Sequence, residues 1–255
     1  VVRQVGPEVT DRKPGDRVTA LMANGSHAEL ASVPATSTWL LPDGVSFEQA
    51  ACVPVAFGTA HDCVHEFGRV QAGETALIQA GTSGVGIAAV QIAKRAGATV
   101  IATSSSDEKL ERLRGYGMDH GVNYATGDFV AQVRQLTGGK GVDLVVDSVG
   151  GKILTGSLQC LAYRGRAITV GNAGRDPQPL DISVLAPGNH SLTGVFLGAE
   201  IVHERTRAMI GRLVDDVASG RLRVLVDRMF PLADAAAAHA YIESRQAVGR
   251  VVLVP

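Results

Sequence analysis

The sequence predicts an α/β protein in which a doubly wound parallel sheet interrupts a smaller β-rich part. Between residues 75 and 196, short apolar strands alternate with helices, which is the pattern of a parallel sheet covered on both faces. The 30 glycines and the low aromatic content of 4% suit many tight strand–helix turns around an Ala, Val, Leu and Ile core. Residues 1–54 show no helical period and are typical of short strands and turns.

The first elements are expected to be short. Lys13-Pro14-Gly15-Asp16 is a turn signal, so a strand should follow it. The strands expected in this part are residues 17–21 and 27–33, and a third that ends with Trp39-Leu40-Leu41-Pro42. Two helices are then expected at residues 47–52 and 58–67. A break between these helices is expected at Val53-Pro54, because proline interrupts helical hydrogen bonding.

The alternation that follows supplies the parallel sheet. Its expected strands are residues 75–79, 99–103, 120–124, 142–147, 166–170 and 191–196. Its expected helices are residues 86–96, 107–116, 128–136 and 152–161. The tail predicts a helix over 204–219, a strand over 227–230, a helix over 233–244 and a strand over 250–254. These last elements could return to pack on the β-rich first part, which would make the sheet an insertion.

Composition and charge argue against several classes of partner. The formal net charge of −1 gives no reason to expect nucleic acid or an anionic membrane. No uninterrupted apolar run reaches the roughly 18 residues that a membrane span needs, and no secretory signal is visible at the start. The cysteines, Cys52, Cys63 and Cys160, are an odd and widely spaced set, unlike a disulfide framework or a zinc quartet. They are expected to be buried thiols in a reducing cytoplasm.

The turn after the first buried strand carries the clearest functional signal. It reads Gly81-Thr82-Ser83-Gly84-Val85-Gly86 and lies between a strand and a helix. A helix N-terminus offers unpaired N–H groups and a partial positive charge to a phosphate. In the dinucleotide fingerprint the first glycine makes the tight turn, the middle one lets the backbone approach the pyrophosphate, and the last allows close helix packing. Here the middle position is Ser83, with Gly84 after it, which departs from the strict pattern.

The end of the second strand predicts which nicotinamide cofactor binds. NAD usually requires an acidic residue there, about 20 residues after the first glycine, to hold the ribose 2′-hydroxyl. Here Ser104 and Ser105 leave room for the 2′-phosphate of NADPH, and Lys109 could neutralise it. Asp107 and Glu108 are acidic and close, which opposes this interpretation. Ser105 with Glu108 also fits a helix capping box, a role that is compatible with phosphate binding.

Four motifs stand in the order of a known family. They are Lys13-Pro14-Gly15-Asp16-Arg17-Val18, Leu41-Pro42-Asp43-Gly44-Val45-Ser46, Ala80-Gly81-Thr82-Ser83-Gly84-Val85-Gly86 and Asp147-Ser148-Val149-Gly150. Over essentially its whole length the chain resembles the quinone oxidoreductase (zeta-crystallin-like) branch of the medium-chain dehydrogenase/reductase superfamily. The resemblance implies an NADP-binding Rossmann domain, residues 58–197, inserted in a partial GroES-like catalytic domain. Residues 1–57 would form the first part of that domain, and residues 198–255 the C-terminal return to it.

The resemblance also implies roles for single residues. Thr59 matches a threonine beside the nicotinamide, and Tyr124 matches a tyrosine at the adenosine end. Ser105 and Lys109 match positions that hold the 2′-phosphate. The loops near the nicotinamide are implied at Ser148, Gly171, Asn172, Phe196 and Leu197, and a segment that closes over the cofactor at Arg245 and Gly249. The predicted cofactor site is therefore Thr59, Gly81, Ser83, Gly84, Val85, Gly86, Ser104, Ser105, Lys109, Tyr124, Ser148, Gly171, Asn172, Phe196, Leu197, Arg245 and Gly249.

Zinc is not expected. The zinc alcohol dehydrogenase branch places a Cys ligand four residues before the nicotinamide threonine, and here that position is Val55, which cannot ligate. The four-cysteine structural zinc lobe is also absent. His27, His61 and His65 remain, but no Cys or acid joins them at ligand spacing. The family also carries more chain before the Lys-Pro-Gly-Asp motif, including a tyrosine and an asparagine near the substrate, so no catalytic residue can be assigned.

The expected function is zinc-independent hydride transfer from NADPH to a small acceptor, a quinone or an α,β-unsaturated carbonyl. The cofactor supplies the chemistry and the protein supplies orientation and water exclusion. The alternatives are an enoyl-thioester reductase, free-standing or from a polyketide synthase, an NADPH-binding protein without turnover, and a zinc alcohol dehydrogenase. The last strand of the sheet is expected at an exposed edge, where it could pair with its copy in a homodimer, as is common in the family.

Overall fold

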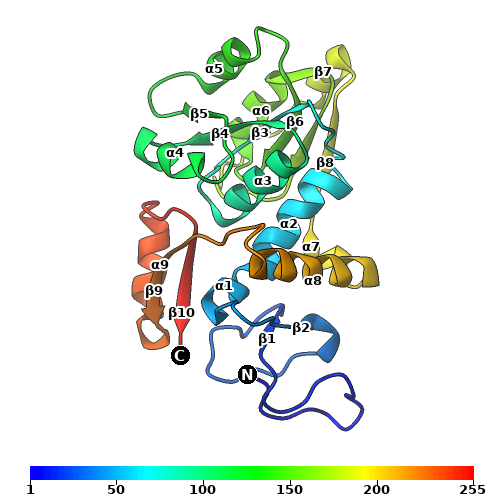
Figure 1. The fold of residues 1–255 in the computed structure, drawn as a ribbon. Helices are drawn as coiled ribbons and strands as arrows, with labels where there is room; N and C mark the ends of the chain where they lie inside the picture. The colour runs from blue at the N-terminus through cyan, green and yellow to red at the C-terminus, as the bar shows by residue number, and fades with distance from the viewer. The chain divides into compact units, whose positions relative to one another are not determined.

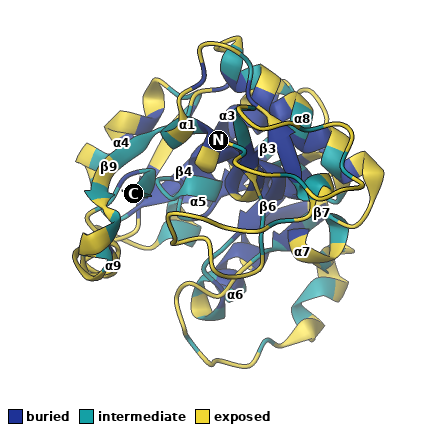
Figure 2. Ribbon diagram, turned by 90° about the horizontal axis from the view of Figure 1, so that it is seen from below, coloured by how far each residue is buried: buried dark blue, intermediate teal, exposed yellow.

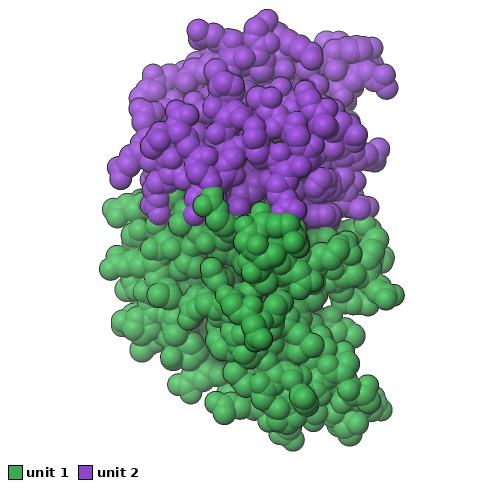
Figure 3. Space-filling view, viewed as in Figure 1, with its two compact units in different colours: residues 1–58, 197–255 green, residues 59–196 purple.

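The computed structural model describes residues 1–255 as two compact units (Figure 3). Unit 1 consists of Val1–Gly58 together with Leu197–Pro255, and unit 2 is Thr59–Phe196. Unit 1 is therefore built from two segments that are far apart in the sequence, whereas unit 2 is continuous. No helix in the structure is both long and apolar enough to cross a membrane.

Unit 2 contains a six-stranded sheet in which every pair of neighbours is parallel. Its strands are β3 (Thr75–Ile78), β4 (Thr99–Ser104), β5 (His120–Asn123), β6 (Val142–Asp147), β7 (Leu161–Thr169) and β8 (Ser191–Gly194). Their order is β5-β4-β3-β6-β7-β8. The chain starts at β3 in the middle, moves outward to β5, and then returns to β6 beside β3. This order confirms the predicted doubly wound sheet, with β8 at an edge as expected.

Helices cover both faces of this sheet (Figure 1). The helices α3 (Gly84–Arg95) and α4 (Asp107–Arg114) lie on one face, and α5 (Phe129–Leu136) and α6 (Gly151–Gln159) on the other. Val133 of α5 and Leu158 of α6 belong to one buried cluster with Leu77 and Val145 of the central strands. The central strands are accordingly the buried part of the unit (Figure 2). Strands that are covered on both faces explain why their sequences are apolar almost throughout.

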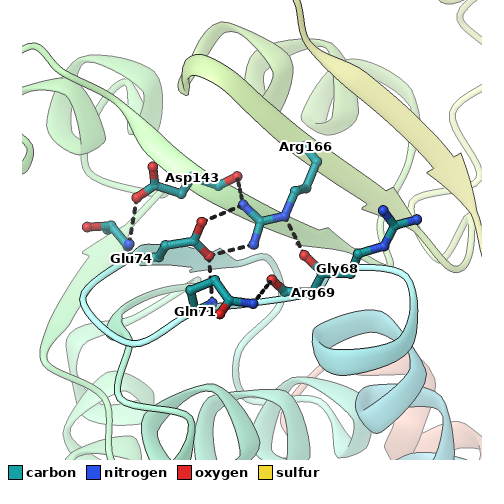
Figure 4. Close-up of polar contacts among 7 residues, drawn as sticks. Gly68, Arg69, Gln71, Glu74, Asp143 and Arg166 are labelled. Carbon is teal, nitrogen blue, oxygen red and sulfur yellow. Dashed lines mark hydrogen bonds and ion pairs between the residues drawn. The ribbon is translucent and has the colours of Figure 1, made fainter.

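The amino-terminal end of the sheet is held by a partly buried cation (Figure 4). The guanidinium of Arg166, on β7, donates to both carboxylate oxygens of Glu74 and to the carbonyl oxygens of Gly68 and Asp143. Glu74 Oε2 also accepts the Gln71 N–H at 2.8 Å. Since Glu74 directly precedes β3 and Asp143 is the second residue of β6, one arginine on β7 links three strands. This network lies at the end of the sheet opposite to the glycine turn.

Unit 1 contains two small sheets. The strands β1 (Val18–Ala20) and β2 (Thr38–Leu40) pair antiparallel, and β9 (Val226–Pro231) and β10 (Arg250–Val254) pair parallel. Its helical segments include α1 (Phe47–Ala51), α7 (Leu197–Glu200), α8 (Glu204–Ala218) and α9 (Ala235–Glu243). Helix α8 packs against β2, and the Trp39 indole N–H donates to Arg207 O at 2.8 Å.

Three local expectations are wrong. Residues 27–33 form bends rather than a strand, and nearly all of them are exposed, so no side-chain burial favours pairing. The chain does not break at Val53-Pro54. Instead the π-helical segment η2 (Val53–Phe57) follows α1, α2 (Gly58–His61) follows η2, and a second π-helical segment, η3 (Asp62–Glu66), comes next. The third concerns β7, which begins at Leu161, five residues earlier than expected, directly after the shorter helix α6.

Candidate cofactor-binding site

The glycine turn joins β3 to α3, and two of its positions accept no side chain. A Cβ on Gly81 would lie 2.7 Å from the Cβ of Ala102, and a Cβ on Gly86 would lie 2.3 Å from Ala80 O. Both glycines are buried, while the residues between them are partly exposed. The turn therefore packs its first and last glycines against β4 and its own backbone, and leaves residues 82–85 accessible.

The backbone of this turn offers donors to a ligand. The Ser83 side chain is the N-cap of α3, and its Oγ accepts the Gly86 N–H at 3.0 Å. The N–H groups of Thr82, Gly84 and Val85 have no hydrogen-bond acceptor within the protein. Three free amides at a helix N-terminus, with its partial positive charge, are well suited to phosphate oxygens.

The end of β4 carries hydroxyl groups in two different situations. Thr103 and Ser104 are buried, and Ser104 Oγ lies 3.2 Å from Thr82 Oγ1 within the turn. Ser105 is partly exposed, and its hydroxyl makes no hydrogen bond in the structure. The prediction that Ser105 caps the next helix is wrong, because Ser106 is the N-cap of α4 and accepts the Lys109 N–H at 3.3 Å. The Ser105 hydroxyl is therefore available to a ligand.

The neighbouring strand completes this corner. The Tyr124 N–H donates to Ser104 O at 3.1 Å, so Tyr124 follows β5 directly beside the end of β4, and its side chain is exposed. The Asp107 carboxylate accepts a hydrogen bond from Asn123 Nδ2 at 3.1 Å. Ser105, Lys109 and Tyr124 all follow the carboxyl ends of β4 or β5. Of the two nearby acidic residues, Asp107 is hydrogen bonded to the side-chain amide of Asn123.

A second group of predicted residues gathers at the ends of β6 and β7. The N–H of Ala173 donates to Ser148 O at 3.1 Å, and a Cβ on Gly171 would lie 3.2 Å from the same oxygen. A Cβ on Gly150 would lie 2.8 Å from Asn172 Oδ1. Ser148, Gly171 and Asn172 are thus neighbours. Because all strands of the sheet are parallel, these loops lie at the same edge as the glycine turn.

The remaining predicted residues fall in both units. Thr59 is buried in α2 and Phe196 is exposed after β8, and both belong to unit 2. Leu197, Arg245 and Gly249 belong to unit 1. Arg245 and Gly249 both have positive φ angles, of 58° and 98°. A contact of these three residues with the cofactor stays a prediction.

Sequence reasoning missed two polar residues beneath the turn. Gln79, which follows β3, and Ser157, in α6, are buried and hydrogen bonded to each other at 2.9 Å. Ser157 in turn donates to the buried carboxylate of Asp147. Burial raises the pKa of Asp147, although hydrogen bonds from Gly150, Val149 and Ser157 act to lower it. A polar side chain at the end of an apolar strand is the signal that could have found Gln79.

The structure assembles no recognisable metal site. No group of three or more His, Cys, Asp or Glu side chains could hold a metal ion. The rings of His61 and His65 are in tilted contact, with 5.0 Å between their centroids. All three cysteines are buried and free, and burial raises the pKa of Cys63 to about 12. Val55, at the position of the zinc-branch cysteine, is 52% exposed. Zinc independence stays a prediction.

Curated relatives agree with this architecture. The profile of the family described as "Zinc-binding dehydrogenase" matches residues 84–215. A quinone oxidoreductase from Pseudomonas aeruginosa is 35% identical over 100% of the chain and 79% of its own length. A 2-haloacrylate reductase from Burkholderia sp is 37% identical over 100% of the chain and 78% of its own length. The phthioceranic/hydroxyphthioceranic acid synthase of Mycobacterium tuberculosis is also 37% identical over 99% of the chain, which spans only 12% of that protein.

Solved structures agree as well. The quinone oxidoreductase of Escherichia coli, solved in complex with NADPH, superposes with a TM-score of 0.94 at 32% identity over 100% of this chain and 80% of that chain. The CurK enoyl reductase superposes with a TM-score of 0.85 at 30% identity over 99% and 76% of the two chains. The sheet, the turn and these matches together place the chain in the medium-chain dehydrogenase/reductase superfamily. The chain belongs to the quinone oxidoreductase-like branch of the medium-chain dehydrogenase/reductase superfamily.

Proposed function

We propose that this chain is a zinc-independent, NADPH-dependent reductase that delivers a hydride to a quinone or an α,β-unsaturated carbonyl. The observation that carries the proposal is the arrangement at the carboxyl end of the sheet, where β3 leads into the glycine turn. There, three free amides lie beside a strand end that bears Ser104 and Ser105 in place of the acidic residue typical of NAD enzymes, and Lys109 lies in the helix that follows. The relatives described as quinone oxidoreductase and 2-haloacrylate reductase support this choice of reaction.

The residues present fit NADP(H). The amides of Thr82, Gly84 and Val85 would bind the pyrophosphate, since their N–H groups have no competing acceptor. Ser105, Lys109 and Tyr124 would hold the adenosine 2′-phosphate, and the Ser105 hydroxyl is unused within the protein. The residues proposed for the nicotinamide half are Thr59, Ser148, Gly171, Asn172, Phe196 and Leu197, with Arg245 and Gly249 closing over the cofactor. NADPH supplies the hydride when it is bound.

The protein's part in the reaction is orientation. Buried glycines and capped helix ends give the turn a fixed shape, so the pyrophosphate is bound by groups that need no rearrangement. Fixing the cofactor at one end of the sheet places its reactive face relative to an acceptor, which lowers the entropy cost of the transfer. A quinone can take its proton from water, whereas an enone also needs protonation at its α carbon.

An enoyl-thioester reductase is the second candidate. The similarity to a stretch of the phthioceranic/hydroxyphthioceranic acid synthase and to the CurK enoyl reductase favours it. An enoyl thioester is itself an α,β-unsaturated carbonyl, so both candidates use the same hydride donor. They differ in the acceptor that binds across from the nicotinamide.

Steady-state kinetics separate these candidates. NADPH oxidation is measured with 1,4-benzoquinone, with an enone and with a crotonyl thioester, and each series is repeated with NADH. The proposal expects turnover of the quinone or the enone and a clear preference for NADPH. A higher kcat/KM for the thioester would select the enoyl reductase. Tight NADPH binding with no turnover of any acceptor would make the chain a binding protein, and stoichiometric zinc in metal analysis would contradict the zinc-free mechanism.

We also propose that the chain forms a homodimer through β8. This strand is at the edge of the six-stranded sheet, so one row of its backbone groups has no strand partner. A strand edge of this kind can pair with its copy about a two-fold axis. Light scattering on the eluting protein should give twice the mass of one chain. The Val195 N–H donates to Thr169 O of β7, so the N–H of the preceding residue, Gly194, points to the free side, and a Cβ there would meet nothing within 4 Å. Gly194→Pro should therefore block the pairing and return the protein to a monomer. A monomeric wild-type protein would contradict the proposal.

A further inference from the structure

Four buried polar side chains form one hydrogen-bonded chain at the carboxyl end of the sheet in unit 2, beneath the proposed cofactor site. They are Gln79, Thr103, Asp147 and Ser157, and each is at most 3% exposed. They come from four places in the fold: Gln79 directly follows β3, Thr103 and Asp147 lie at the ends of β4 and β6, and Ser157 lies in the last turn of α6. We call these four residues the buried polar chain. Such groups cost free energy to bury unless every one is paired.

The hydrogen bonds of the buried polar chain all run in one direction. The Thr103 hydroxyl donates to Gln79 Oε1 at 2.7 Å. Gln79 Nε2 donates to Ser157 Oγ at 2.9 Å, and the Ser157 hydroxyl donates to Asp147 Oδ2 at 3.3 Å. Each hydroxyl has only one proton, so the Thr103 and Ser157 hydroxyl donors are both committed. The Asp147 carboxylate is the final acceptor.

One end of the buried polar chain holds the start of the glycine turn. Thr103 Oγ1 accepts the Ala80 N–H at 3.2 Å, and Thr103 O accepts the Gly81 N–H at 2.8 Å. Ala80 has a φ of +48°, in the left-handed region that is unfavourable for a residue with a Cβ. The Thr103 residue thus stabilises a strained backbone at the point where the phosphate-binding segment begins.

The other end holds the loop that carries Ser148. Asp147 Oδ1 accepts the N–H groups of Val149 at 2.8 Å and Gly150 at 2.7 Å. Gly150 has a φ of +77°, and it leads into α6, which carries Ser157. The same carboxylate therefore fixes the loop after β6 and, through Ser157 and Gln79, is joined to Thr103.

We propose that Gln79, Thr103, Asp147 and Ser157 are positioning residues, which fix the phosphate-binding turn relative to the Ser148 loop. The inference rests on the proposed function, in which these two loops bind opposite halves of NADPH. A dinucleotide spans both loops at once, so a change in their spacing weakens its binding even when each loop keeps its own shape. An apolar core could supply stability here, whereas directional hydrogen bonds specify a single arrangement.

The first test removes one hydroxyl with little change of shape. Thr103→Val deletes the donor to Gln79 and the acceptor of the Ala80 N–H, and Thr103→Ser keeps both. By fluorescence titration, Thr103→Val should bind NADPH about tenfold more weakly, a loss comparable to one or two hydrogen bonds. Thr103→Ser should restore most of the affinity, and the KM for NADPH should follow the dissociation constant.

A matched control separates positioning from loss of stability. Glu74→Gln removes an ion pair at the opposite end of the same sheet, so it should lower the melting temperature while leaving the dissociation constant for NADPH unchanged. Ser157→Ala is the second variant, and it breaks the buried polar chain in α6. If both substitutions act by breaking the same buried polar chain, their effects should not add. The loss of binding free energy in the double variant Thr103→Val/Ser157→Ala should then be less than the sum of the losses in the two single variants.

The outcomes are decisive. Normal NADPH affinity in folded Thr103→Val or Ser157→Ala would overturn the inference and leave the buried polar chain a purely structural feature. An affinity loss in Glu74→Gln as large as that in the other variants would also overturn it, because the effect would then follow stability. Failure of the wild-type protein to bind NADPH would instead contradict the proposed function itself.

Discussion

Single atoms decide whether the phosphate-binding turn can form. Gly86 has so little space that a Cβ would lie 2.3 Å from Ala80 O and 2.8 Å from the backbone of Gly81. Both contacts are with main-chain atoms, which cannot move aside as the end of a flexible side chain can. The requirement for glycine at this position is therefore steric and local.

The substitution Gly86→Ala should weaken NADPH binding about tenfold to a hundredfold, because the added methyl group forces the turn away from α3. Gly211→Ala is a suitable control, since its Cβ would meet nothing nearer than Trp39 Cδ1 at 3.6 Å. Affinities are compared by titration at a temperature where both variants are folded. Unchanged affinity in Gly86→Ala would rule out the turn as the pyrophosphate site.

Cofactor preference is a second property of single residues. Lys109→Ala should narrow the difference between the NADPH and NADH dissociation constants about tenfold, because it removes a cation from the proposed 2′-phosphate corner. Lys94→Ala is the matched control, because it removes a lysine that pairs with Asp119 at 2.6 Å elsewhere on the unit. Equal affinity of the wild-type protein for the two cofactors would contradict the 2′-phosphate assignment.

The serines at the end of β4 show what the sequence could and could not predict about single residues. Ser104, Ser105 and Ser106 are chemically identical, and the capping-box pattern favoured Ser105. In the structure β4 extends to Ser104, which pairs with Asn123, and the helix begins at Asp107. The burial of Leu110 and Leu113 against the sheet sets the start of α4, and this packing is invisible in a run of equal residues.

At the scale of helices and strands, the two ends of the six-stranded sheet have different roles. The carboxyl ends carry the proposed cofactor site, whereas the amino ends are tied by Arg166 and Glu74, whose side chains are 17% and 24% exposed. Burial acts to raise the pKa of Glu74, but hydrogen bonds from Arg166 and Gln71 and the charge of Arg166 outweigh it. The pKa is lowered from its ordinary 4.5.

A lowered folded-state pKa stabilises the protein only while the carboxylate is charged. The contribution of Glu74 is complete above its unfolded-state pKa and is lost as the pH falls through the lower folded-state value. At pH 7, Glu74→Gln should therefore lower the free energy of unfolding by about 1–3 kcal/mol. Urea unfolding at a series of pH values should show the stabilities of the two proteins converging as the pH falls through the lowered folded-state pKa of Glu74. A difference that persists undiminished in acid would contradict this role.

Long periodic elements could be predicted, and irregular ones could not. The apolar strands of unit 2 and the amphipathic helix α8 could be recognised because their buried residues follow a regular pattern in the sequence. Residues 27–33 alternate weakly but are exposed, so nothing drives them into a strand. Pro54 suggested a break, yet it occupies the first turn of η2, where its missing N–H leaves no hydrogen bond unmade.

The whole molecule combines a continuous unit with a discontinuous one. Within unit 1, Trp39 on β2 donates to Arg207 O in α8, which joins two segments that are 168 residues apart in sequence. Gly58 lies against Leu197 and Ile210, where a Cβ would come within 3.2 Å and 3.4 Å of their side chains. Unit 1 is thus held together by contacts that no local sequence pattern encodes.

Trp39→Phe should lower the free energy of unfolding by about 1–3 kcal/mol, because it removes a buried hydrogen bond and leaves a small cavity. Circular dichroism during urea unfolding measures the change. Tyr163→Phe is the control, since Tyr163 is 72% exposed and its loss of a hydroxyl should change stability by less than about 0.5 kcal/mol. An equal effect of the two substitutions would contradict the docking role of Trp39.

The discontinuity of unit 1 has a consequence for biosynthesis. During translation, residues 1–58 emerge before unit 2, and their partners in Leu197–Pro255 emerge after it. Unit 2, which needs no later residues, can fold during translation, since domains usually fold as units as they appear. Until α8 arrives, the apolar side chains that it covers stay exposed to water and to other nascent chains. Chaperone capture should therefore concentrate on residues 1–58, and it should fall once Leu197–Pro255 has been made.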